Sequence, residues 1–286
     1  MNLALAGLVL ALLGPGEPPE GGIVVDKEKK TVRIPVRIAP RKLPNLPDIY
    51  PIEVIATWPT PKGQKAHETI VNFDMMPSEI HKAIESLGLK AGKPGRGDAG
   101  CSGPILEIYL DLPAVNGHPA GLVGIEKLLV DMRTGRTLPP ITWHFTGSVV
   151  PDGKYAADST GTMIGLYPVT DEVVVQSNFT MREESLIKLE TNKQLLPGEN
   201  TPVTLVIKVA SGPPPAPATA GFDPEKAVLK LSRAVGPGAA AAPSVGAGPP
   251  PPAALTSDPF ENRKEVRPGK ALQDSTRPID LPAAQK

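Results

Sequence analysis

Histidines and a single cysteine are the residues of this 286-residue chain that could support metal, acid–base or nucleophile chemistry. His67 and Glu68 begin as a helical zinc-protease motif does. That motif requires a second histidine four residues after the first, where this chain has Val71. His144, in the stretch WHFTGS, completes the set that a metal-dependent or hydrolytic enzyme could use, namely His67, Glu68 and His144.

The glycine-rich loop at 92–103 gives no stronger indication of chemistry. Its lone Cys101 could be a nucleophile, but such a thiol needs an activating neighbour, and the chain has no G-x-S-x-G motif. The loop lacks the phosphate-binding G-x-x-x-x-G-K-[ST] pattern, and it follows a predicted helix instead of opening one. The sequence therefore predicts no catalytic residue and no cofactor.

Composition excludes several classes of partner and site. The chain has 30 basic and 30 acidic residues, so it carries no net charge that would attract nucleic acid or an anionic membrane. Aromatic residues make up 4% of the chain, too few for a base-stacking surface. With only Cys101, the chain cannot form an internal disulfide or a cysteine-ligated iron–sulfur cluster.

The first 21 residues are an apolar start followed by a Pro/Gly linker. As a helix, Leu3–Leu13 would be about 17 Å long, too short for a hydrocarbon core of about 30 Å. The run fits the apolar region of a secretory signal, although no basic residue precedes it and no A-x-A site follows it. We therefore expect export to the periplasm or cell envelope, with no integral membrane span; the alternative is a buried N-terminal segment.

Residues 22–209 carry nearly all of the strand patterning. TVRIPVRI at 31–38 alternates apolar and polar residues, Pro35 indicates an edge, and the turn DKEKK predicts a hairpin with 22–25. ILEIYLDL at 105–112 alternates in the same way. Further strands are predicted at 52–58, 69–73, 128–132, 141–145, 163–167, 173–177 and 203–209.

One helix is predicted over about 77–88. Pro77 suits the first turn, Gly88 ends the helix, and an apolar stripe runs between them through Ile80, Ala83, Ile84 and Leu87. His81 falls off this stripe and is expected to face solvent. The predicted fold class is α+β, a mostly antiparallel sheet with this one main packed helix.

Residues 210–286 form a tail rich in proline, alanine and glycine, with runs such as GPPPAPATAG. Such a composition predicts a largely disordered segment, because it cannot bury enough apolar surface to offset chain entropy. FDPEKAVLKLSRAVG predicts a short helix at 223–235. That helix is either fluctuating and weakly docked or a partner-binding segment.

Several stretches in this order and spacing resemble the YdjY-domain proteins of bacteria. They are GGIVVDKEKKTVRIPVRI, KAHETIV, PSEIHKAIESLGLKAGKP, WHFTGS, YAADSTGTMIGLYP and PGENTPVTLVI, spread over about 22–208. The resemblance implies an exported or envelope α+β domain, and it supplies no established catalytic residues. Some members carry a clustered cysteine motif and have been described as ferredoxin-like, a property that Cys101 alone cannot support.

We therefore expect a non-enzymatic binding or interaction module of the cell envelope, without a cofactor. Its partner would be an unknown protein or envelope component, reached through the tail. The alternative is a metal-dependent or hydrolytic enzyme using His67, Glu68 and His144. Any pocket is expected where residues 65–70, the loop 92–103 and WHFTGS converge.

Overall fold

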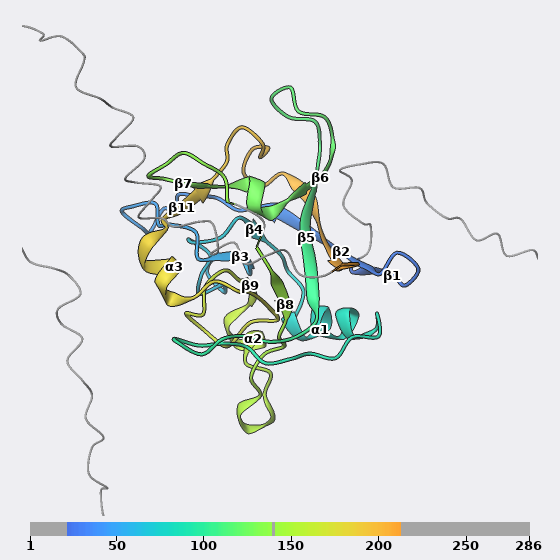
Figure 1. Ribbon diagram of the computed structural model, residues 1–286. Helices are drawn as coiled ribbons and strands as arrows, with labels where there is room; N and C mark the ends of the chain where they lie inside the picture. The colour runs from blue at the N-terminus through green and yellow to red at the C-terminus, as the bar shows by residue number, and fades with distance from the viewer. Residues whose placement is uncertain (1–21, 139–140, 213–286) are drawn as a thin grey trace, which may run out of the picture. The chain divides into compact units, whose positions relative to one another are not determined.

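The computed structural model describes residues 22–138 and 141–212, and their strands form a sheet that closes on itself (Figure 1). Each strand of the closed sheet pairs with the next, and the last pairs with the first. In order they are β2 (Thr31–Ile38), β12 (Pro202–Val209), β5 (Ile105–Leu112), β8 (Trp143–Phe145), β10 (Val175–Ser177), β9 (Thr162–Gly165), β3 (Val54–Thr57) and β4 (Val71–Asn72). The described part is therefore an eight-stranded β-barrel.

Shorter strands extend this barrel. β1 (Val24–Asp26) pairs with β2 as the predicted hairpin, and β6 (Gly121–Gly124) pairs with β5. A separate two-stranded sheet joins β7 (Leu129–Asp131) to β11 (Leu189–Thr191). The pairs in the barrel are antiparallel except for β3 with β4 and β9 with β10. The helical segments are α1 (Pro77–Glu85), α2 (Ala157–Thr160), α3 (Met181–Leu186), η1 (Ile125–Leu128) and η2 (Pro151–Gly153).

The predicted α+β class, with one main helix packed on a sheet, is therefore wrong. The described chain is mostly β, and its helices are short: α1, the longest, has nine residues. A closed sheet covers its inner face with its own strands, so it does not need a helix to bury that face. Period-two alternation indicates that one face is buried, but it does not tell whether the sheet is open or closed.

The alternating strands bury the predicted residues. On β2, Val32, Ile34, Val36 and Ile38 are buried. On one side β2 pairs with β12 along its length. On the other side it pairs with β1 at one end and with β4 at the other, so residues 34–36 have a partner only in β12. Pro35 lies in that gap, where its missing amide hydrogen removes no ladder bond.

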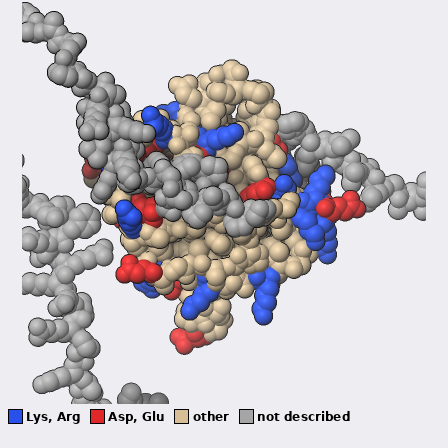
Figure 2. Space-filling view, in the orientation of Figure 1, with Lys and Arg blue, Asp and Glu red and all other residues tan. Residues whose placement is uncertain are grey.

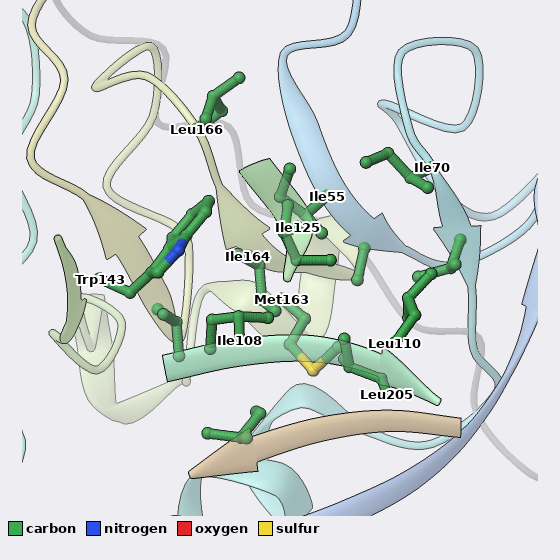
Figure 3. Packing of buried hydrophobic residues seen from close by; sticks show 14 of the residues in the cluster. Ile55, Ile70, Ile108, Leu110, Ile125, Trp143, Met163, Ile164, Leu166 and Leu205 are labelled. Carbon is green, nitrogen blue, oxygen red and sulfur yellow. The ribbon is translucent and has the colours of Figure 1, made fainter. Parts of the chain in front are cut away.

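The core fills the interior of the closed sheet. Side chains from distant parts of the sequence meet there, including Ile55, Ile108, Trp143, Met163 and Leu205 (Figure 3). Helix α1 adds Ile80 and Ile84, which are fully buried. No helix in the described ranges is long and apolar enough to cross a membrane. The predicted export signal at 1–21 and the predicted helix at 223–235 lie outside the described residues.

Candidate functional site

His67 and Glu68 lie together in an ion-pair network before β4. The Lys65 ammonium is 2.6 Å from Glu53 and 2.7 Å from Glu68, and His67 Nε2 is 3.2 Å from Glu68 Oε1. Burial alone would lower the pKa of Lys65, but hydrogen bonds to the two carboxylates raise it above its usual value. Lys65 therefore remains protonated and is the ion-pair partner of the Glu68 carboxylate.

His144 makes its contacts elsewhere. It lies on β8, and its Nδ1 is 3.1 Å from the carbonyl oxygen of Gly103. Among the residues that the structure describes, no group of three or more His, Cys, Asp or Glu side chains could hold a metal ion. The structure thus brings His67 to Glu68, but it records no contact from either residue to His144.

Arg41 is a buried charge that the sequence did not single out. Its Nε donates to Glu190 at 2.8 Å, one terminal nitrogen donates to the carbonyl of His67 at 2.9 Å, and the other donates to the carbonyl of Tyr50. Burial would raise the pKa of Glu190, but the hydrogen bond from Arg41 and that from the Thr191 amide lower it below its usual value. The guanidinium group is a structural clamp, since its donors are used by the protein itself.

The glycine-rich loop packs on β8 and β10, as expected for its meeting with WHFTGS. The Gly92 amide donates to the carbonyl of Phe145, and the fully buried Gln176 holds the amide and carbonyl of Gly95. Cys101 donates to the carbonyl of Ser177, and burial raises the pKa of its thiol, which favours the unreactive protonated form. Residues 65–70 instead pair with β3 and its neighbours, so the three segments do not form one pocket.

His81 does not face solvent, which corrects the prediction. Its side chain is 18% exposed, its Nδ1 is 2.9 Å from the Tyr155 hydroxyl, and its Nε2 is 3.3 Å from Glu85. The Ser148 amide donates to the same hydroxyl oxygen, so Tyr155 connects the loop to His81 on α1. Burial raises the pKa of Tyr155. The loop 147–155 covers the face of α1 that helix periodicity assigned to solvent.

Charged side chains form no large single-sign patch on the uncovered part of the face in Figure 2. Basic and acidic residues are interspersed there. This surface fits the balanced composition and provides no broad electrostatic footprint for a polyanion. A binding site on this face would depend on local shape and local charge.

A cavity of about 340 Å³ lies beside β5. We call it the β5 groove and define it by Ile105, Glu107, Tyr109, Glu126, Ile141 and Trp143. It opens where strand pairing lapses. β8 pairs with β5 only at Ile105 and Leu106, and β6 pairs with β5 only from Tyr109 onward. The edge of β5 at Glu107 and Ile108 therefore has no strand partner on this side.

Two carboxylates line this groove beside aromatic rings. Glu126 Oε1 accepts a hydrogen bond from Trp143 Nε1 at 3.1 Å, and Glu107 Oε2 accepts one from the Tyr109 hydroxyl at 3.0 Å. Burial, the hydrogen bond to Glu107 and the charges of Glu107 and Glu126 raise the pKa of Tyr109 to about 12. Both carboxylates therefore act electrostatically on the same phenol.

Comparison with known families decides the identity of this fold. A family model described as the YdjY domain matches residues 23–208. The chain belongs to the YdjY domain family. No curated protein and no solved structure matches the chain.

The YdjY domain contains nearly all of the structure described above. The match begins at the residue before β1 and ends within β12, so the Arg41 clamp, the His81 contacts and most of the β5 groove belong to it. Only Ala210 and Gly212 extend the lining of the groove beyond the matched residues. The resemblance inferred from the ordered sequence stretches is confirmed.

Neither the β5 groove nor the Arg41 clamp was predicted from the sequence. An arginine in a loop carries no local signal of burial, and its partner Glu190 is distant along the chain. The groove depends on where the pairing of β5 lapses, which no single segment encodes. Glu107 could have been noted as an acid on the outer face of an alternating strand.

Proposed function

We propose that this YdjY domain is a non-enzymatic binding module of the cell envelope that binds its ligand in the β5 groove. The groove itself carries the proposal. Its volume of about 340 Å³ lies in the range of about 300–1,000 Å³ that ligand pockets occupy. Apolar and aromatic residues line it together with a few polar groups, the usual composition of small-molecule sites.

The side chains considered for catalysis have structural partners. Glu68 is paired with Lys65, His144 bonds to the Gly103 carbonyl, and Cys101 bonds to the Ser177 carbonyl. These contacts support a binding role over nucleophilic or metal-dependent chemistry. The proposed envelope location is supported by the apolar stretch at Leu3–Leu13, and the Pro-rich tail would add a second means of reaching an envelope partner.

A ligand screen by thermal denaturation of the full chain tests this function. We expect some small molecules to raise the melting temperature of the native protein, because a ligand that binds only the folded state stabilises it. Replacing Ile105 with tryptophan should fill part of the groove and abolish these shifts. Ile49→Trp is the matched control, since Ile49 is about half exposed and lies outside the groove.

Binding that is insensitive to Ile105→Trp would contradict the proposed site. Turnover of a substrate that is lost in His67→Ala or His144→Ala would contradict the non-enzymatic role. Cell fractionation checks the location: recovery of the full chain with cytoplasmic markers alone would contradict export.

A further inference from the structure

We infer that the β5 groove binds a small aliphatic amine, with its ammonium group at Glu126 and its apolar stem against Ile105. This inference rests on the proposed function and adds the chemical class of the ligand.

Glu126 is a groove carboxylate for which the described residues supply no ion pair. Among the described residues, Glu107 and Glu126 are the charged side chains that line the groove. Glu107 is 3.1 Å from the ammonium of Lys208, which lies outside the lining. Glu126 makes no ion pair with any described residue, and only its Oε1 receives a recorded side-chain hydrogen bond, from Trp143. Its Oε2 can therefore accept from a ligand.

The surroundings of Glu126 favour a cation with an apolar stem. Tyr109 is half-buried and lines the groove, and an aromatic ring attracts a cation placed over its face. Ile105 is half-buried and offers apolar surface to methylene groups, above the buried Ile141. An ammonium group can donate charge-assisted hydrogen bonds to the Glu126 carboxylate.

Both ends of the groove exclude an extended peptide added as a strand. β8 occupies the edge of β5 at Ile105 and Leu106, and β6 occupies it from Tyr109 onward. The free edge spans only Glu107 and Ile108, which is too short for a strand to add by backbone hydrogen bonds. The short edge therefore favours a small ligand over an added strand.

Calorimetric titration of the full chain with 1-pentylamine at neutral pH and low salt tests the inference. We expect saturable binding that weakens as salt is added, because the main contact is between opposite charges. Glu126→Gln should weaken binding at least tenfold. Glutamine keeps an oxygen that can accept from Trp143 Nε1 but carries no charge.

Glu28→Gln is the matched control, because Glu28 is exposed on the β1–β2 turn, and it should leave binding unchanged. If the Glu126→Gln substitution perturbs folding, Glu126→Asp provides the second variant. It keeps the charge and should retain more affinity than Glu126→Gln. Equal affinities of the native protein and a folded Glu126→Gln variant would overturn the inference.

Three ligand outcomes separate this inference from the proposed function. Equal binding of 1-pentanol and 1-pentylamine would overturn the amine and leave an apolar binding groove. Binding of Nα-acetyl-lysine methylamide without binding of 1-pentylamine would overturn the free amine in favour of a protein side chain. If no amine binds while the screen yields other ligands sensitive to Ile105→Trp, the inference fails and the proposed function stands.

Discussion

Replacing Arg41 with alanine should destabilise the protein by about 3–5 kcal/mol, the usual cost of removing one partner of a buried ion pair. Arg41 is 8% exposed, and its guanidinium connects Glu190 to the carbonyls of His67 and Tyr50. Alanine leaves the half-buried Glu190 carboxylate without its cation and leaves both carbonyls without a donor. Because these partners come from three separate segments, the loss should also loosen β11.

Urea denaturation of the native and variant proteins measures this change. Arg37→Ala is the matched control: Arg37 is exposed and donates a single hydrogen bond to the carbonyl of Asn200, so the loss should be below about 1 kcal/mol. Lysine at position 41 should rescue little, because an ammonium cannot reproduce the planar fork of a guanidinium. A loss below about 1 kcal/mol in Arg41→Ala would show that the clamp is not structural.

The same clamp has a pH dependence with a defined sign. The pKa of Glu190 is lower in the folded protein than its usual value of 4.5. Its contribution to stability is therefore fully present above the unfolded-state pKa and is lost as pH falls through the folded-state pKa. In Arg41→Ala the guanidinium group no longer lowers the pKa of Glu190. The stability difference between native protein and Arg41→Ala should thus shrink as the solution is acidified below about pH 4.

Gly103→Ala should lower the free energy of unfolding by about 3–5 kcal/mol, because backbone strain and overpacking combine at this position. Gly103 has φ 146°, a conformation that only glycine adopts readily. An added Cβ would lie 2.1 Å from the carbonyl oxygen of Phe145, which is backbone and cannot rotate away. The substitution should push the glycine-rich loop off β8 and weaken the short pairing of β8 with β5.

Two glycines provide the controls for this substitution. A Cβ at Gly100, in the same loop, would meet nothing within 4 Å, so Gly100→Ala should change stability by less than about 0.5 kcal/mol. Gly88 has φ 89° and open space around it, so Gly88→Ala isolates the backbone strain at about 1 kcal/mol. Equal losses in Gly88→Ala and Gly103→Ala, measured by thermal denaturation, would contradict the proposed clash.

Local patterns predicted the elements well and their assembly poorly. The alternation of TVRIPVRI and ILEIYLDL gave β2 and β5 with the observed bounds. Closure of the sheet depends on β2 pairing with both β4 and β12, contacts between residues far apart in sequence that alternation does not encode. His81 shows the same limit, because helix periodicity cannot anticipate a covering loop from residues 147–155.

One local signal was present and overlooked. Thr180 and Glu183 form a capping box, in which the Thr180 side chain accepts from the Arg182 amide and Glu183 accepts from the Thr180 amide. A threonine followed three residues later by a glutamate is typical of a helix N-terminus, so this spacing predicts the start of α3.

The position of β12 between β2 and β5 sets the order in which this protein can mature. β2 is made early, and its neighbour β12 is the last strand of the described chain. A growing polypeptide therefore cannot complete the ring of hydrogen bonds until residues 202–209 have left the ribosome. An unfinished chain would stay open, with β2 and β5 each lacking a partner along one edge.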